Sequence, residues 1–229
     1  MMKTLSGFQL AQSIDQTNLN PLLSIKECVK FFEDSKFHNF ASVAILPIHT
    51  KLAAGILRGS HTKVCAAISY PFGGVQGYLK AKEVEYAIKD GAEEIDYVVN
   101  MAAIKSREYK KVLDEARLII SAAEEKPVKA IIEMWNLTED EINNTCESVL
   151  EAHVTFVKSS TAYKGYKNMR AGTVEDAVLL KKIIQNRANI KIAGGIKNIQ
   201  LALELLSVGV NRIGTSSGVQ IMKAFRDLK

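Results

Sequence analysis

Short apolar runs alternate with longer amphipathic segments along almost the whole chain. The runs are nearly continuously apolar, which is typical of parallel strands that are covered on both faces. The pattern predicts eight strands: Ser13–Asp15, Ala41–Leu46, Val64–Ser69, Glu94–Val98, Lys129–Glu133, Val154–Lys158, Ile190–Ala193 and Asn211–Ile213.

The segments between the runs have helical spacing of apolar residues and recognisable end signals. Ser24 is suited to N-capping, Gly91 to ending a helix, and Thr138 with Glu141 to forming a capping box. We therefore predict helices over Ser24–Lys36, Gly77–Asp90, Ser106–Glu124, a segment from Leu137, Thr173–Asn186, Asn198–Ser207 and a segment from about Ser217.

A strand followed by a helix about every 28 residues predicts a TIM-type (β/α)8 barrel, an α/β fold. The chain has 229 residues and is 47% hydrophobic, which is enough for one substantial core. No linker divides it, so we expect a single domain over residues 1–229. The rival fold is an open doubly wound sheet, but no Gly-x-Gly-x-x-Gly fingerprint follows an early strand.

The net charge and the cysteine content limit which kinds of binding partner and which cellular compartment are expected. The net charge of +5 is spread along the chain without interleaved aromatic residues, so an anionic substrate explains it better than nucleic acid. No apolar run is long enough to cross a bilayer, and the N-terminus lacks an apolar signal core. We therefore expect a cytoplasmic protein without a membrane partner, in which Cys28, Cys65 and Cys146 are buried free thiols.

Charged residues interrupt three of the predicted strands. Lys158 closes one apolar run, Lys191 lies inside another, and Asp96 lies inside a third. Lysine is almost never fully buried unless something compensates it. In a barrel these side chains can meet at one mouth, where the lysines would lower each other's pKa and give a nucleophilic amine. The alternative is a salt bridge that fixes strand register, but a buried ion triad contributes little net stability.

Glycine-rich turns follow the last two predicted strands. Gly194–Gly195 comes after the seventh, and Gly214 with Ser216 and Ser217 comes after the eighth and opens the last helix. Barrels often bind phosphate at these two places, where backbone N–H groups and a helix N-terminus attract an anion. The pair favours a phosphate site over structural turns. Asp15, expected at the end of the first strand, either lines the mouth or caps a turn.

Other polar residues carry weaker signals. Glu133 either joins the charges or caps a loop, and the basic segment Lys164–Arg170 either assists phosphate binding or is a solvated loop. We predict no metal site, because metal-ligand spacing is absent among the cysteines and the four histidines, His38, His49, His61 and His153.

Four segments resemble motifs of the deoxyribose-phosphate aldolase family of class I aldolases. They are Glu94-Ile95-Asp96-Tyr97-Val98-Val99-Asn100, Val157-Lys158-Ser159-Ser160-Thr161, Lys191-Ile192-Ala193-Gly194-Gly195-Ile196 and Arg212-Ile213-Gly214-Thr215-Ser216-Ser217. The segments Ile14–Leu19 and Tyr70–Gly73 are similar to the family too. The resemblance runs in order over nearly the whole chain.

The resemblance implies a TIM barrel that reversibly cleaves 2-deoxy-D-ribose 5-phosphate into D-glyceraldehyde 3-phosphate and acetaldehyde, in deoxyribonucleotide catabolism, without metal or cofactor. It implies that Lys158 forms the Schiff base, that Lys191 tunes this amine and that Asp96 serves proton transfer. It also implies substrate or phosphate contacts from Asp15, Thr161, Gly194, Gly195, Gly214, Ser216 and Ser217. A sugar phosphate is the expected partner, and a homodimer is the expected assembly.

The sequence departs from the family pattern in places. Ala162 replaces a glycine near the phosphate, Ser159 replaces a threonine beside the nucleophile, and Ala44 stands where many members have a cysteine. The chain ends at Asp227-Leu228-Lys229 without the C-terminal tyrosine of some members, so we expect lower turnover. Two alternatives stay open: a barrel that acts on a different sugar phosphate, and a barrel that binds a phosphorylated metabolite or scaffolds partners without turnover.

Overall fold

The computed structural model of the protein describes residues 5–228 and forms a closed barrel of eight parallel strands in chain order. The first strand pairs with the last, Asp15 lying opposite Gly214, which rules out the open sheet and confirms the TIM fold. The strands are β1 (Ile14–Asn18), β2 (Ser42–Ile45), β3 (Lys63–Ile68), β4 (Glu94–Val98), β5 (Val128–Ile131), β6 (Phe156–Lys158), β7 (Asn189–Ala193) and β8 (Arg212–Thr215).

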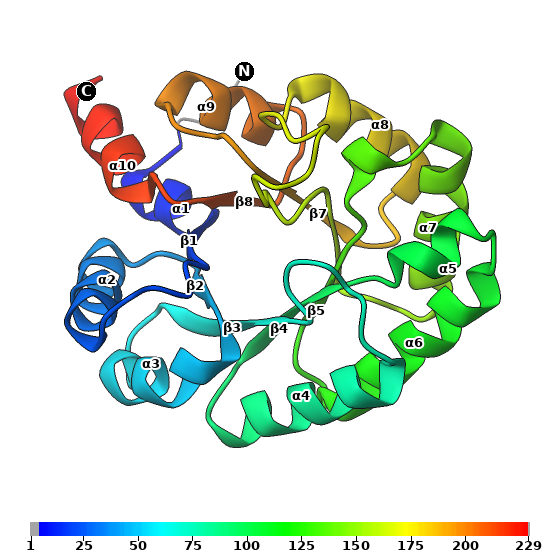
Figure 1. Cartoon of the computed structure of the whole chain (residues 1–229). Helices are drawn as coiled ribbons and strands as arrows, with labels where there is room; N and C mark the ends of the chain where they lie inside the picture. Colours follow the sequence, from blue (N-terminus) through cyan, green and yellow to red (C-terminus); the bar gives the residue numbers. More distant parts are fainter. Residues whose placement is uncertain (1–4, 229) are drawn as a thin grey trace.

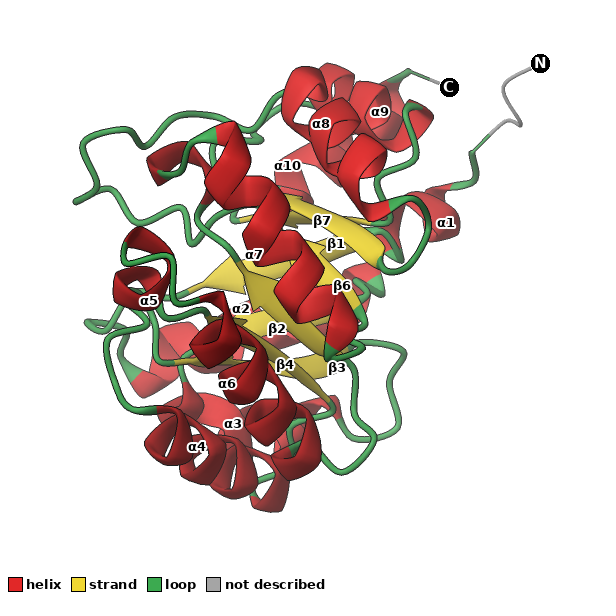
Figure 2. Ribbon diagram, turned by 90° about the vertical axis from the view of Figure 1, so that its right-hand side faces the viewer, coloured by secondary structure: helices red, strands yellow, loops and turns green. Residues whose placement is uncertain are grey.

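The helices surround the ring of strands on the outside, as Figures 1 and 2 show. They are α1 (Gly7–Ala11), α2 (Ile25–His38), α3 (Thr50–Leu57), α4 (Gly77–Lys89), α5 (Met101–Lys105), α6 (Tyr109–Ala122), α7 (Glu139–Glu151), α8 (Val174–Ile184), α9 (Ile199–Ser207) and α10 (Gly218–Asp227). Two short 3-10 helices, η1 (Pro47–His49) and η2 (Met134–Asn136), follow β2 and β5.

The predicted end signals of the helices are confirmed where the sequence carried them. Ser24 and Thr138 each cap a helix in a full capping box, and Gly91 follows α4 with a positive φ of 102°. The sequence pattern gave no bounds for α1, α3 or α5. Each of these helices has eight residues or fewer, so its apolar spacing is too short to stand out.

Two strand boundaries differ from prediction in a way that matters for the site. β1 runs on to Asn18, so Asp15 lies near its amino end and not at its carboxyl end. β8 runs on to Thr215, so Gly214 lies inside the strand and not in the turn after it. Both strands extend because they pair with each other, Gln16 lying opposite Thr215, and this pairing leaves no apolar signature in the sequence.

Apolar side chains fill the layer between the strands and the helices. One large cluster includes Ile95, Ile119, Val149 and Leu205, and a smaller one lies beneath α2 and α3. The three cysteines are buried and free, as predicted. Within residues 5–228, none of the helices has the length and apolar character needed to cross a membrane.

A buried ion pair outside the barrel supports the carboxyl end of β4. Lys80 of α4 lies 2.7 Å from Glu115 of α6, and both side chains are almost completely buried. Lys80 also donates to the carbonyl oxygen of Val98 at 2.8 Å, while Glu115 accepts from the backbone N–H of Asn100 at 3.0 Å. The pair therefore binds the chain just beyond Asp96, since β4 ends there.

Candidate active site

Asp96, Lys158 and Lys191 meet, as the sequence predicted, but they lie buried inside the barrel and not at an open mouth. Asp96 comes from β4, and the lysines come from the adjacent strands β6 and β7, where they lie opposite each other. Both amines donate to the same carboxylate oxygen, Asp96 Oδ2, at 2.7 Å from Lys158 and 2.8 Å from Lys191. Lys158 is only 2% exposed, and the other two are fully buried.

A fourth charged strand residue, Lys129 of β5, contacts the other side of Asp96. Its amine lies 3.0 Å from Asp96 Oδ1 and donates to Glu94 Oε2 at 2.6 Å. The thiol of Cys65 in β3 also donates to Asp96 Oδ1 at 3.0 Å. Both oxygens of Asp96 are therefore fully used, and the carboxylate is held rigidly between β3, β5, β6 and β7.

Asp15 lies inside this charged cluster and not at the barrel mouth. Its carboxylate is 2.6 Å from the amine of Lys191 and 2.5 Å from the guanidinium of Arg212. Arg212 also reaches Glu94 at 3.2 Å. The expectation that Asp15 lines the mouth or caps a turn is therefore wrong. The cause is the extension of β1 to Asn18, which leaves Asp15 near the amino end of the strand, inside the barrel beside Lys191.

The two predicted lysines differ in pKa. Burial, aided by the ammonium of Lys191, outweighs Asp96 and lowers the pKa of Lys158. Burial would lower the pKa of Lys191 too, but the carboxylates of Asp15 and Asp96 outweigh it and raise that pKa. The expected mutual lowering is thus correct for Lys158 only, because the sequence did not reveal that Asp15 pairs with Lys191. Lys158 is the better nucleophile of the two.

The carboxylate of Asp96 is held in its ionised form. Burial would raise the pKa of Asp96, but the nearby ammonium groups of Lys129, Lys158 and Lys191 lower it well below its usual range. Burial would lower the pKa of Lys129, but Asp96 and Glu94 outweigh it and raise that pKa. Asp96 and Lys129 therefore keep their charges across the pH range in which Lys158 titrates.

Glu133 fixes the chain immediately after Lys158. It lies just beyond β5 with a left-handed φ of 51°, and its carboxylate accepts hydrogen bonds from Ser160 Oγ at 2.9 Å and from Thr161 N at 3.0 Å. The hydroxyl of Thr161 donates to it as well. Of the two roles considered for Glu133, loop capping is the observed one. The hydroxyl of Thr161, expected to face substrate, is directed to this carboxylate.

The pair Gly194–Gly195 follows β7 with positive φ angles of 104° and 65°. A Cβ on the first glycine would come within 2.7 Å of Trp135, and one on the second within 2.7 Å of Ala171. Both positions therefore need glycine for conformation and for space. This close packing brings the segment after β6 against the turn after β7.

Gly214 makes room for a lysine instead of forming a turn. A Cβ at this position would lie 3.2 Å from Cε of Lys191 and 2.8 Å from Cβ of Ala193. The predicted place of Gly214, in a turn after the eighth strand, is therefore wrong. Its backbone lies in β8 because the strand continues through Thr215.

The chain after β8 packs against the turn after β7. The hydroxyl of Thr215 donates to the carbonyl oxygen of Ile196 at 2.5 Å and accepts from the N–H of Ser217 at 2.9 Å. Ser217 precedes α10 without a side-chain capping bond, and Ser216 is exposed. The structure thus brings Ser216 and Ser217 to the same edge of the barrel as Gly194–Gly195.

Aromatic side chains connect the loops after β3 and β6. Phe72 contacts the rings of Tyr163 and Tyr166 with centroids 5.2 and 6.3 Å apart. Burial and nearby Glu133 raise the pKa of Tyr70 to about 12, so its hydroxyl stays protonated. Within the basic segment, the guanidinium of Arg170 pairs with Asp176 at 2.6 Å and stacks on Trp135, while about half of its side chain stays exposed to solvent.

Replacing Ala162 by glycine is expected to stabilise the protein by about 0.5–1 kcal/mol. Ala162 has a φ of 59°, and a left-handed conformation costs a residue with a side chain about 1–2 kcal/mol, partly offset by the greater unfolded-state entropy of glycine. Urea unfolding measures the change. Ala171→Gly, in the same segment at a negative φ, is the control and should destabilise. Equal effects of the two substitutions would contradict strain at Ala162.

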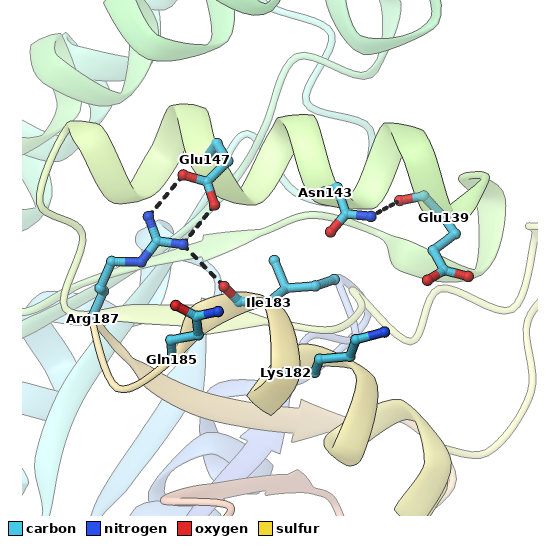
Figure 3. Close-up of a pocket in the computed structure, with 7 residues that line it drawn as sticks. All are labelled: Glu139, Asn143, Glu147, Lys182, Ile183, Gln185 and Arg187. Carbon is cyan, nitrogen blue, oxygen red and sulfur yellow. Dashed lines mark hydrogen bonds and ion pairs between the residues drawn. The ribbon is translucent and has the colours of Figure 1, made fainter.

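A hollow on the surface of the protein lies away from these residues. It has a volume of about 500 Å³ and is bordered by α7 and α8. Figure 3 shows that its most prominent cation, Arg187, points to Glu147, to which it donates two hydrogen bonds of 2.5 and 2.7 Å. No strand residue lines it, so it is separate from the charged cluster. Among residues 5–228, no three His, Cys, Asp or Glu side chains are grouped to hold a metal ion.

Sequence reasoning missed four members of the cluster: Cys65, Glu94, Lys129 and Arg212. Lys129 had a usable signal, because it interrupts the apolar run Val128–Ile132 just as Lys191 interrupts its own. Glu94 and Arg212 stand at strand ends, where charged residues are ordinary, so the sequence pattern gave no reason to select them.

The fold and the site define a TIM barrel with a charged interior and a buried lysine of lowered pKa at the carboxyl end of a strand. Residues 44–224 match the model of the DeoC/LacD family of aldolases. The chain belongs to this aldolase family.

Curated relatives and a solved structure agree with this assignment. The chain is 36% identical to a deoxyribose-phosphate aldolase of Carboxydothermus hydrogenoformans, over 95% of this chain and 96% of the relative. It is 37% identical to a deoxyribose-phosphate aldolase of Thermococcus kodakarensis, over 96% and 98%. The solved structure of QR15, an aldolase, superposes with a TM-score of 0.89 at 35% identity, covering 95% of this chain and 96% of that one.

Proposed function

We propose that the protein is a class I aldolase that reversibly cleaves 2-deoxy-D-ribose 5-phosphate into D-glyceraldehyde 3-phosphate and acetaldehyde. The observation that carries the proposal is the nearly enclosed amine of Lys158, whose pKa is lowered although it lies 2.7 Å from Asp96. A neutral amine at such a position attacks an aldehyde. The sugar-phosphate substrate is inferred from the relatives, which are named deoxyribose-phosphate aldolases.

The reaction begins when the Lys158 amine adds to the substrate aldehyde. Loss of water gives an iminium, which accepts electrons from the neighbouring carbon–carbon bond. A base removes the proton from the C3 hydroxyl, the C2–C3 bond breaks, and its electrons form an enamine. Glyceraldehyde 3-phosphate leaves. Protonation of the enamine at C2 and hydrolysis release acetaldehyde and restore the amine.

Asp96 serves the proton transfers in this proposal. Its Oδ2 contacts the amines of both Lys158 and Lys191, so it lies beside the reacting nitrogen. Because its pKa is well below the usual range, the carboxylate of Asp96 is a weak base and does not itself hold the transferred proton. The proton therefore passes through a water molecule beside the Asp96–Lys158 pair, and Asp96 acts on the transfer through its negative charge. Lys191 remains charged and disfavours a second positive charge on Lys158.

The phosphate of the substrate binds at the edge formed by the turns after β7 and β8. Gly194, Gly195, Ser216 and Ser217 supply backbone and hydroxyl donors there, and α10 begins at Gly218 with its N-terminus beside them. These contacts lie away from the breaking bond, so they orient the substrate. The proposed phosphate contacts leave out Asp15, Thr161 and Gly214. Asp15 pairs with Lys191 and Arg212, the hydroxyl of Thr161 donates to Glu133, and Gly214 lies inside β8 against Lys191.

Schiff-base trapping tests the function. The protein is incubated with 2-deoxyribose 5-phosphate and borohydride, then analysed by intact mass and peptide mapping. We expect a reduced adduct on Lys158, from either the whole sugar phosphate or its two-carbon fragment. A panel of other sugar phosphates tests the alternative that the barrel acts on a different substrate. Release of acetaldehyde from 2-deoxyribose 5-phosphate supports the proposed reaction, whereas turnover of another sugar phosphate without acetaldehyde supports the alternative. A folded protein that gives no adduct would refute the aldolase proposal and favour the metabolite-binding barrel.

We further propose that the chain works as a homodimer in the cytoplasm, in deoxyribonucleotide catabolism. Large apolar side chains are exposed on and around α2, among them Leu22, Ile25 and Phe37. The three unpaired cysteines suit a reducing compartment. Sedimentation velocity measures the assembly, and a single monomeric species at micromolar concentration would exclude the dimer.

A further inference from the structure

The charged groups inside the barrel form a closed ring of alternating sign. Lys191 bridges Asp15 and Asp96, Lys129 bridges Asp96 and Glu94, and Arg212 bridges Glu94 and Asp15. All six contacts are between 2.5 and 3.2 Å. Each cation of the ring therefore has two carboxylates, and each carboxylate has two cations.

Lys158 stands outside this ring. Among the described residues 5–228, its single carboxylate contact is Asp96, which the ring already shares between Lys129 and Lys191. Three carboxylates are thus balanced by three cations before Lys158 is counted. The other titratable group in the cluster is the Cys65 thiol, whose pKa is raised by burial and by Asp96, so it adds no charge. Strand β2 carries no charged residue.

A proton on Lys158 would make this buried cluster carry a net positive charge. An uncompensated charge away from water is costly, and a buried amine responds by losing its proton. The position of Lys129 matters here, because it contacts Oδ1 of Asp96 while Lys158 contacts Oδ2. Without Lys129, Asp96 would have one cation fewer to balance it and would hold the proton on Lys158.

We propose that Lys129 is a positioning residue of the cleavage reaction, which closes the ring and so leaves Lys158 as the amine that is free to be neutral. The inference rests on the proposed Schiff-base role of Lys158. Lys129 is fully buried and directed to Asp96 and Glu94, so it acts through Asp96 and does not touch substrate. No charge of Lys129 itself changes during turnover.

The test is the pH dependence of Lys129→Met. Removing a ring cation should raise the pKa of Lys158 and move the acidic limb of the rate profile to higher pH, by about one unit or more. Turnover near neutral pH should fall about tenfold or more and recover at high pH. Competitive acylation of Lys158 with acetic anhydride, followed by peptide mass spectrometry, measures the same titration without turnover.

Two further variants change the balance in a defined way. Glu94→Gln removes one ring anion and should move the acidic limb to lower pH. The double variant Lys129→Met/Glu94→Gln removes one charge of each sign and should bring the limb back towards its position in the unmodified protein. These variants keep the proposal testable if Lys129→Met alone does not fold.

Lys80→Met is the matched control, because Lys80 is also fully buried and paired with a carboxylate, but outside the barrel. It should leave the acidic limb in place. The inference is overturned if Lys129→Met lowers the rate without moving the limb, if Lys80→Met moves it equally, or if the double variant does not reverse the shift. Failure of the aldolase function is distinct, since trapping would then fail in the unmodified protein while the acylation titration of Lys158 stayed measurable.

Discussion

Replacing Lys158 by methionine is expected to lower the rate of deoxyribose 5-phosphate cleavage by more than about 10⁴-fold, because no other group can take over covalent catalysis. Lys191 is the nearest other amine, but its pKa is raised by Asp15 and Asp96, so it stays protonated. Borohydride should trap no adduct on the variant. A coupled assay for glyceraldehyde 3-phosphate measures the loss.

The same variant is expected to fold as well as the unmodified protein. Methionine has nearly the length of the lysine stem, and the ring of three carboxylates and three cations stays balanced without Lys158. The urea midpoint should therefore be unchanged or higher. Near-normal cleavage by the folded variant, or an adduct trapped on Lys191, would show that Lys158 is not the nucleophile.

Asp96→Asn is expected to lower turnover by about 10²–10⁴-fold, the usual contribution of positioned proton transfer. It should also shift the pH profile. Asp96 favours the protonated form of Lys158, so removing its charge lowers the pKa of that amine further. Activity rises with pH as Lys158 loses its proton, and the acidic limb should therefore move to lower pH while the maximal rate falls.

Two measurements separate this prediction from simple loss of the fold. Borohydride should still trap an adduct on Lys158, because the amine is intact and more often neutral. Circular dichroism should report a folded barrel. Loss of trapping together with loss of turnover would instead assign Asp96 to holding the lysine in place, and an unmoved limb would contradict its electrostatic effect.

The ring of charged side chains also makes the interior of this barrel different from that of an ordinary TIM barrel. The interior of a TIM barrel is ordinarily filled by layers of branched apolar side chains. Here Asp15, Lys129 and Lys191 are all fully buried in that space. Buried ion networks contribute little net stability, whereas breaking one is costly. The charged interior is therefore better explained by the reactivity of Lys158 than by stability.

The sequence pattern identified the residues that break an apolar run. Lys158, Lys191 and Asp96 each stood out in this way, and the barrel topology then predicted that they meet. Lys129 carried the same signal and was overlooked. Arg212 and Glu94 could not be found by this rule, because a charged residue at a strand end is equally common on a solvated edge.

By itself the sequence determined the barrel, the order of its strands and the chemistry of its central groups, since the hydrophobic period and the placement of lysine in apolar runs are local properties. Only the tertiary structure decided which charges are partners. Closing β1 against β8 brings Asp15 between Lys191 and Arg212, which lie 176 and 197 positions further along the chain. Pairing at that separation depends on strand register, which the apolar pattern does not encode. For that reason the difference in pKa between Lys158 and Lys191 could be explained only from the folded barrel.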